Sequence, residues 1–252
     1  MKKVDRLEKE KLFHNKRFET DEDLRKKTDK YYLVNEHLVD RYVEIISKLC
    51  LNQLTLEYGC GIGSQSERWL QFGAKLTGID ISEAGIQKAK SNIEASEYEA
   101  QYFVMNAEET SFDKDTFDLV IGSGIIHHLE LKKSYRELAR ICKPNAHIVF
   151  LEPLGHNPFI NLYRFLTPEL RTEDEHPLTL NDLKLLGSYF KNVEVEYFSL
   201  FSLLAVPFRN TFLFDGLYAL FRNIDSIILS LPFIKKYAWM CLIQASNPVK
   251  NS

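Results

Sequence analysis

The sequence predicts an α/β fold, with a doubly wound, mostly parallel sheet and helices on both of its faces. Three observations lead to this prediction. Short apolar, β-branched runs alternate with segments of helical periodicity between residues 54 and 151, the pattern of successive strand–helix–strand units. A glycine-rich loop follows the first of these runs. The 252 residues, 45% of them hydrophobic and 27% charged, suffice for one large buried core.

The N-terminal residues 1–50 are expected to form a helical arm. Residues 1–30 are rich in both basic and acidic side chains, so this part depends on packing for its order. Between residues 30 and 49 apolar positions recur at helical spacing, which predicts an amphipathic helix. We expect the arm to fold over the ligand as a lid. Its expected docking points are Leu12, Phe13 and Phe18.

The next part, residues 51–153, is predicted to be the α/β core that binds the ligand. Its strands are expected at residues 54–58, 74–80, 102–105, 117–121 and 147–151, and its helices at 66–72, 83–95 and 131–142. Ser82 precedes the second of these helices and belongs to a residue type that caps helix N-termini.

Residues 154–252 are expected to cover the substrate side of the same domain. The stretch from Pro153 to Pro177 is interpreted as an irregular insert. A helix at 179–190 and strands at 193–200 and 238–245 are predicted to follow, with a short helical hairpin at 205–236 before the last strand.

Composition and charge exclude several classes of protein. The 32 Lys and Arg residues against 35 Asp and Glu give a net charge of −3, so no nucleic-acid partner is expected. The four cysteines form no C-x-x-C pair, which fits a reducing compartment. The N-terminus has no apolar signal core, and the longest uncharged apolar run, residues 197–208, is shorter than the roughly 20 residues that a spanning helix needs. A cytoplasmic protein is expected.

The loops after the predicted strands carry the candidate site. In an open α/β sheet the ligand lies at the carboxyl ends of the strands, beside the first one. The first loop runs from Glu57 to Gly63, and its glycines allow the backbone to turn tightly and approach a ligand. After the second strand comes Asp80, placed where a carboxylate can accept hydrogen bonds from a ribose. The later loops contribute residues 106–108 and 122–128.

The glycine loop distinguishes between two kinds of adenosine ligand. A dinucleotide needs G-x-G-x-x-G, so that a helix N-terminus receives the pyrophosphate. Here Gly59, Gly61 and Gly63 give G-x-G-x-G, and Ser64 stands in place of the later glycine. The carboxylate of Glu57 would repel a phosphate but suits an ammonium group. The predicted ligand therefore has a ribose and a cationic amine, and no phosphate.

These motifs resemble those of the class I S-adenosylmethionine-dependent methyltransferases, in particular the group that acts on small molecules. The resemblance covers roughly residues 50–153. Its motifs are Leu56–Gly63, Gly78–Ser82, Phe117–Ile121 with His127 and His128, and the turn at Ile141–Ala146, where Asn145 and Ala146 replace two glycines. The resemblance implies a Rossmann-like sheet of seven strands, bound S-adenosyl-L-methionine and transfer of a methyl group.

The resemblance also implies which residues hold the cofactor. Asn106 stands where the family usually has an Asp that accepts from the adenine amino group; the amide oxygen can also accept, but without charge. Cys60 has no evident activating partner, so inert packing is favoured over a nucleophilic role. The expected cofactor-binding residues are Glu57, Gly59, Cys60, Gly61, Gly63, Asp80, Ile81, Asn106, Ala107, Glu108 and Ser123.

Four residues are candidates for a general base, which is needed only if the acceptor is protonated at the working pH. They are His127, His128, Glu152 and His156. The alternative is that the histidines pack the loop, and that Glu152 and His156 belong to a solvated segment held by ion pairs. No metal site is expected, because the spacing of Glu152, His156 and His176 matches no standard zinc pattern.

Aromatic residues are concentrated near the C-terminus, where eleven of the 31 lie between Tyr197 and Trp239. Residues 205–236 are apolar with a mildly cationic rim. They are interpreted as core or homodimer contact, as the wall of a pocket for a hydrophobic or aromatic acceptor, or as a surface that rests on a membrane. Two other function classes stay open: a non-catalytic cofactor-binding or scaffold protein, and an RNA or protein methyltransferase.

Overall fold

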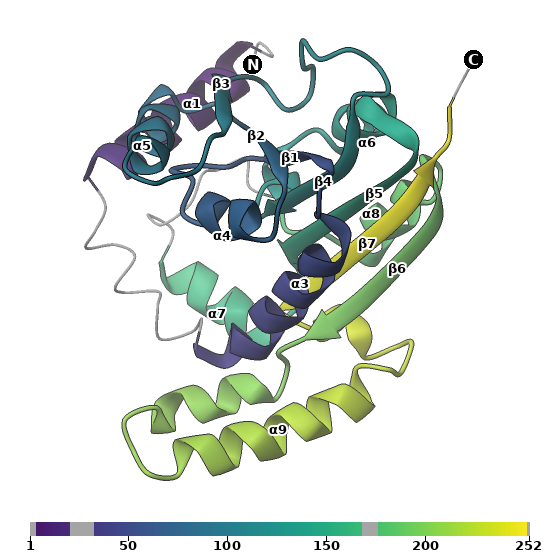
Figure 1. The fold of residues 1–252 in the computed structure, drawn as a ribbon. Coiled ribbons are helices and arrows are strands. Elements are labelled where there is room, and N and C mark those ends of the chain that lie inside the picture. Colours follow the sequence, from purple (N-terminus) through teal and green to yellow (C-terminus); the bar gives the residue numbers. More distant parts are fainter. Residues whose placement is uncertain (1–3, 21–32, 168–175, 251–252) are drawn as a thin grey trace.

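The computed structural model describes residues 4–20, 33–167 and 176–250. Seven strands form one sheet in the order β3-β2-β1-β4-β5-β7-β6 (Figure 1). The strands from β1 to β5 run parallel, and β7 is antiparallel to both β5 and β6. The predicted doubly wound α/β sheet is therefore confirmed, including its seven strands.

The elements have the following bounds. The strands are β1 (Leu54–Tyr58), β2 (Lys75–Asp80), β3 (Gln101–Val104), β4 (Phe117–Ser123), β5 (Cys142–Pro153), β6 (Phe190–Phe198) and β7 (Met240–Pro248). The α-helices are α1 (Val4–Thr20), α3 (Glu36–Leu49), α4 (Ser66–Gln71), α5 (Glu83–Glu94), α6 (Leu131–Ile141), α7 (Pro158–Leu166), α8 (Leu180–Leu186) and α9 (Phe214–Ile228). Short 3-10 helices are η1 (Leu33–Asn35), η2 (Ile126–His128), η4 (Ser202–Phe208) and η5 (Lys235–Tyr237).

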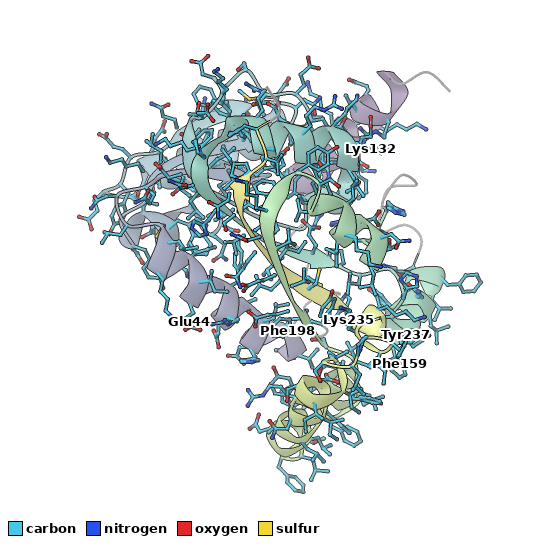
Figure 2. The ribbon with its side chains drawn as sticks, turned by 90° about the vertical axis from the view of Figure 1, so that its right-hand side faces the viewer. Glu44, Lys132, Phe159, Phe198, Lys235 and Tyr237 are labelled. Atoms are coloured by element: carbon cyan, nitrogen blue, oxygen red, sulfur yellow. The ribbon has the colours of Figure 1, made fainter. Side chains whose placement is uncertain are left out.

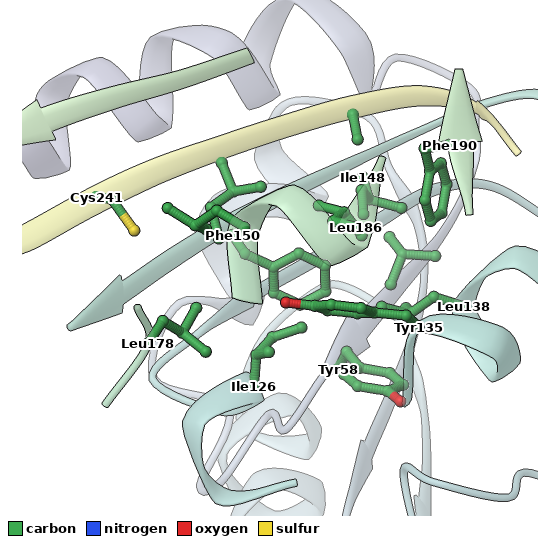
Figure 3. Close-up of a cluster of buried hydrophobic side chains, with 14 of the residues drawn as sticks. Tyr58, Ile126, Tyr135, Leu138, Ile148, Phe150, Leu178, Leu186, Phe190 and Cys241 are labelled. Carbon is green, nitrogen blue, oxygen red and sulfur yellow. The ribbon is translucent and has the colours of Figure 1, made fainter. Parts of the chain in front are cut away.

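The hydrophobic core has two layers, one on each face of the sheet. On β5 the side chains alternate between them: Phe150 belongs to the layer that includes Tyr58 and Tyr135, whereas Val149 belongs to the layer that includes Trp69. Figure 3 shows the first of these layers. Because helices cover both faces, the central strands carry buried apolar side chains on both of their faces. Burial of the central strands fixes the positions of their carboxyl ends, and the loops that follow these ends form the site.

Helix α7 corrects the prediction of an irregular insert between Pro153 and Pro177. The side chain of Asn157 accepts a hydrogen bond from the Ile160 N–H, and Pro158 occupies the first turn. Both are favourable at a helix start, since proline has no N–H to leave unpaired there. The prediction was wrong for residues 158–166, and residues 168–175 of the same stretch lie outside the described part.

Helix α1 packs against α5 through polar contacts. Lys11 Nζ lies 2.7 Å from Glu83 Oε1, and Asn15 Oδ1 accepts from the Ser82 hydroxyl at 2.6 Å. The ring of Phe18 lies against the glycine loop, where a Cβ added to Gly61 would be 3.1 Å from it. Leu12, in contrast, is 59% exposed, so its predicted docking role was wrong.

Candidate functional site

A cavity of about 550 Å³ lies at the carboxyl ends of β1, β2 and β4. Its walls come from the loops that follow β1 to β4 and from α1, α3, α7 and the start of β7. The predicted site residues that line it are Glu57, Gly59, Cys60, Gly61, Asp80, Ile81, Asn106, Ala107, Ser123, His127 and His128. Its lining, as far as described residues define it, does not include Gly63, Glu108, Glu152 or His156.

The glycine loop turns at positions that favour glycine. Gly59 has a φ of +75° and Gly61 a φ of +54°, both in the left-handed region. A Cβ on Gly59 would also lie 2.8 Å from the side chain of Ile125. Both glycines are therefore required for the shape of the loop.

Asp80 ends β2 and holds the glycine loop in place. Its Oδ2 accepts from the Gly61 N–H at 2.9 Å, and its Oδ1 accepts from the Ser82 N–H at 2.8 Å. Burial raises the pKa of Asp80, while these two donors and the nearby His14 and His128 act in the opposite direction. Each carboxylate oxygen has a second lone pair, so both can accept from a ligand as well.

Glu57 lies on β1 and is 8% exposed. Burial raises the pKa of Glu57 to about 7, and the hydrogen bond that its Oε2 accepts from the Ser66 hydroxyl opposes this shift only in part. A cation in the cavity would favour the charged carboxylate and return the pKa toward its ordinary range. The site therefore favours a ligand with a positive charge near Glu57.

The loop after β3 presents Asn106 and Ala107 to the cavity, whereas Glu108 of the same loop points elsewhere. The side-chain oxygen of Asn106 accepts from the Glu108 N–H at 3.0 Å, and one lone pair is left for a ligand. Glu108 is buried elsewhere, where its Oε1 accepts from Arg6 of α1 and from the Glu130 N–H. Glu108 thus connects α1 and the start of α6 to the core.

Glu152, fully buried at the end of β5, positions His127. Its Oε1 accepts from the N–H groups of Ile125 (3.0 Å) and Ile126 (2.8 Å). Its Oε2 lies 2.7 Å from Nδ1 of His127. Because an ionised carboxylate can only accept, this contact places the imidazole proton on Nδ1 and leaves Nε2 as the acceptor. His127 lines the cavity, so the pair can take a proton from a bound molecule.

The two other predicted histidines lie in different places. His128 lines the main cavity beside α1. His156 is exposed and lines a second cavity of about 410 Å³, together with His176 and Arg164. The thiol of Cys60 is buried, and burial raises its pKa well above the ordinary range, so it is neutral at pH 7.

Several lining residues were missed by sequence reasoning because distant segments supply them. Tyr42 of α3 donates from its hydroxyl to the Gly122 carbonyl at 3.1 Å, at the end of β4. Its place in the apolar stripe of the helix indicated burial but not the cavity. The other missed lining residues include Glu10, His14, Arg17, Trp69, Tyr163, Arg164, Trp239 and Met240.

Part of the chain is similar to known methyltransferase sequences. Residues 56–150 match the profile of a family described as "Methyltransferase domain". A ubiquinone biosynthesis O-methyltransferase from Alkalilimnicola ehrlichii is 33% identical over 116 residues, which cover 45% of this chain and 47% of the relative. The chain thus matches about half the length of this relative.

Solved structures share the fold. A phosphoethanolamine N-methyltransferase from Haemonchus contortus, in complex with S-adenosyl-L-methionine, superposes with a TM-score of 0.64 at 17% identity, over 94% of this chain and 60% of that one. The magnesium protoporphyrin IX methyltransferase of Synechocystis PCC 6803, with bound SAH, gives 0.60 at 13% identity over 94% of both chains. At these identities the likeness establishes the fold.

Proposed function

We propose that the protein is an S-adenosyl-L-methionine-dependent methyltransferase that acts on a small hydrophobic or aromatic molecule. The match of residues 56–150 to the methyltransferase-domain family supports this proposal. The observation that carries this proposal is the convergence of Glu57, Gly61 and Asp80 on one cavity at the carboxyl ends of the strands. A carboxylate for a ribose, a carboxylate for an ammonium group and a close backbone approach are what this cofactor needs.

Three residues that line the cavity would hold the cofactor. Asp80 would accept from the ribose hydroxyls, Asn106 would accept from the adenine amino group, and the charge of Glu57 would favour the ammonium end. When bound, S-adenosyl-L-methionine supplies a methyl group on a positively charged sulfur, so the leaving group needs no acid. The protein's task is then to align the acceptor and to exclude water. Helix α1, which lines the cavity with Phe13 and Phe18, is the proposed lid.

His127 serves as the general base for an acceptor that carries a proton. The proton passes from the acceptor to Nε2, and Glu152 stabilises the resulting imidazolium through Nδ1. Glu152 does not line the cavity, so it acts as a positioning residue. His128 is the alternative base. The exposed His156 of the second cavity is a weaker candidate, because it lies outside the lining of the main cavity.

The acceptor is proposed to be apolar because of the side chains beside the polar groups. Phe13, Tyr42, Trp69, Tyr163 and Trp239 all line the cavity, and large aromatic side chains favour apolar or aromatic ligands. The name of one similar sequence is consistent with such an acceptor, since that protein acts in ubiquinone biosynthesis.

The apolar hairpin of residues 202–237, which contains η4, α9 and η5, is proposed to rest on an anionic membrane surface without crossing it. Phe212 (94%), Phe233 (84%) and Ile227 (70%) are strongly exposed, and Phe165 of α7 is 81% exposed. The charged side chains that accompany them are mainly basic: Arg209, Arg222, Lys235 and Lys236. Apolar anchors with basic neighbours match the chemistry of an anionic lipid interface. Among the described helices, none combines the length and apolar character needed to span a bilayer.

A transfer assay tests the proposed function. Purified protein is incubated with radiolabelled S-adenosyl-L-methionine and a panel of phenols, catechols and their prenylated derivatives, and methylated products are identified by mass spectrometry. The expected result is a labelled product with an apolar acceptor, lost in the Asp80→Ala variant. Cofactor binding without transfer to any small molecule, protein or RNA would favour the non-catalytic alternative. Transfer only to RNA or protein would overturn the small-molecule assignment.

A further inference from the structure

Two histidines and a glutamate meet where α1 crosses η2. Glu10 and His14 lie four residues apart, on one face of α1, and His128 ends η2. Nε2 of His14 and Nδ1 of His128 each lie 3.4 Å from Oε2 of Glu10. The side chains are 16%, 12% and 5% exposed for His14, His128 and Glu10 respectively. Among the described residues, these three are the His, Cys, Asp or Glu side chains that lie close enough together to share one metal ion.

The two separations from Glu10 fit ligands of a common metal better than hydrogen bonds, and all three ligand atoms lie within 4.8 Å of one another. Zinc holds nitrogen and oxygen ligands at about 2.0–2.2 Å, which places them roughly 3.4 Å apart in a tetrahedron. Hydrogen bonds between such atoms are commonly about 2.7–3.2 Å long. In addition, the buried Nδ1 of His128 has no hydrogen-bond partner among the described residues.

Contacts outside the cluster hold the proposed ligands in place. Arg6 of α1 donates to the His128 carbonyl at 2.8 Å and pairs with Glu108. On the other side, Lys11 pairs with Glu83 of α5. These contacts hold α1 against η2 and α5 without the aid of an ion, so the ligand set is pre-organised.

From this geometry we propose that Glu10, His14 and His128 bind a divalent first-row transition metal ion. Two imidazoles and a carboxylate suit Zn²⁺, Mn²⁺ or Fe²⁺, whereas Mg²⁺ and Ca²⁺ prefer oxygen ligands. The ligands carry one negative charge when both imidazoles are neutral, and the carboxylate of Asp80 is close enough for both histidines to influence its pKa. The surroundings therefore favour a dication.

The ion would connect the proposed lid to the core. All three ligands line the main cavity, so coordination positions that the protein does not fill open into it. A bound ion adds bonds between α1 and η2 and so favours the closed position of α1. This inference goes beyond the proposed methyl transfer, because metal binding can be measured in the absence of any cofactor or acceptor.

The test measures bound metal directly. The full-length chain is stripped with a chelator and titrated with Zn²⁺ by calorimetry and with Co²⁺ by visible absorption, with Mg²⁺ as a comparison. One equivalent of Zn²⁺ or Co²⁺ per chain is expected, with d–d bands for Co²⁺ and no site for Mg²⁺. Glu10→Gln, His14→Gln and His128→Gln should each weaken binding by at least about tenfold.

Matched controls separate this site from non-specific binding and from unfolding. Glu8→Gln changes an exposed carboxylate on the same helix, and His37→Gln an exposed histidine on α3. Both should bind the metal as the unchanged protein does, and circular dichroism checks that every variant is folded. Zn²⁺ should also slow amide hydrogen exchange in α1, an effect lost in His128→Gln. Absence of stoichiometric binding, or equal affinity in all five variants, overturns the proposal.

Discussion

Two buried carboxylates do the same structural work in different parts of the molecule. Glu152 accepts from the N–H groups of Ile125 and Ile126 at the start of η2. Asp225 of α9 accepts from three consecutive N–H groups, those of Leu200, Phe201 and Ser202, where η4 begins. Each satisfies donors that a helix start leaves unpaired. The difference is that Glu152 also holds Nδ1 of His127, at 2.7 Å.

The surroundings of the two carboxylates differ as much as their partners. Around Glu152, Ile126 and Cys241 are buried and His127 lines the cavity. In α9 the one described residue classed as buried is Asp225 itself. The hairpin extends beyond the end of the sheet (Figure 2), and its apolar side chains Phe212, Leu220 and Ile227 are exposed. The same arrangement, a buried carboxylate that accepts from the N–H groups at a helix start, therefore supports the proposed reaction centre in one place and an apolar surface in the other.

The largest effect is expected when the first carboxylate loses its charge. In Glu152→Gln the amide oxygen can still accept from the backbone, but His127 loses its anionic partner. Turnover should fall by about 10²–10⁴-fold, the usual contribution of a positioned base, and cofactor affinity should change little. Steady-state kinetics measure the turnover, and calorimetry measures the cofactor affinity.

The matched variant, Asp225→Asn, should leave turnover on a soluble acceptor within about threefold. It should lower the melting temperature, since a lost hydrogen-bond acceptor costs about 1–3 kcal/mol. Equal losses of turnover in Glu152→Gln and Asp225→Asn would contradict the different roles of the two carboxylates.

Two glycines, one in each region, differ in the space that an added side chain would meet. Gly59→Ala introduces a Cβ at a φ of +75° and 2.8 Å from Ile125, so it should cost about 2–4 kcal/mol of stability and abolish cofactor binding. Gly216 lies in α9, and a Cβ there meets no atom within 4 Å. Gly216→Ala should therefore stabilise the protein by about 0.5–1 kcal/mol. Denaturant unfolding measures both changes, and a stable Gly59→Ala protein with normal affinity would contradict the account of the loop.

A third buried carboxylate, Glu57, should respond to pH. Burial raises the pKa of Glu57 to about 7, so the folded state binds a proton between about pH 4.5 and 7 that the unfolded state does not. Stability of the ligand-free protein should fall as the pH rises through this window.

Affinity for S-adenosylhomocysteine should instead rise by about tenfold between pH 5.5 and 7.5, because the ammonium group of this ligand favours the charged carboxylate of Glu57. In Glu57→Gln both dependences should flatten. Calorimetry and thermal melts across pH measure them, and an unchanged pH profile in this variant would exclude Glu57 as the cause.

The smallest effect is expected for the hairpin surface. Phe212→Ser and Phe233→Ser should each reduce flotation with liposomes that contain anionic lipid by about threefold or more, because each removes a side chain worth about 1.5–3 kcal/mol when buried. Phe103→Ser, which changes a half-exposed ring on β3, serves as the control. Failure of the unchanged protein to float would rule out the membrane, and concentration-dependent dimers lost in Phe212→Ser would favour a second copy of the chain as the partner.

The sequence was sufficient for the elements whose signals are local. The strands β1 to β5 and the loops after them follow from alternating apolar runs and the glycine loop. Helix α7 was missed although Asn157 and Pro158 carry a local helix-start signal. The cluster of Glu10, His14 and His128, and the burial of Asp225 against Leu200, depend on contacts between segments far apart in the chain. Contacts between such distant segments leave no periodic pattern in the sequence, so they could not be predicted from it.

The most direct test of the central claim is the binding of S-adenosylhomocysteine to the purified protein. Calorimetry should detect one site per chain. Asp80→Ala should weaken the affinity by at least about tenfold, because it removes charge-assisted hydrogen bonds to the ribose, whereas the exposed Asp113→Asn should leave the affinity unchanged. Absence of binding, or equal affinity in the unchanged protein and the Asp80→Ala variant, would contradict a cofactor site at the ends of β1 and β2.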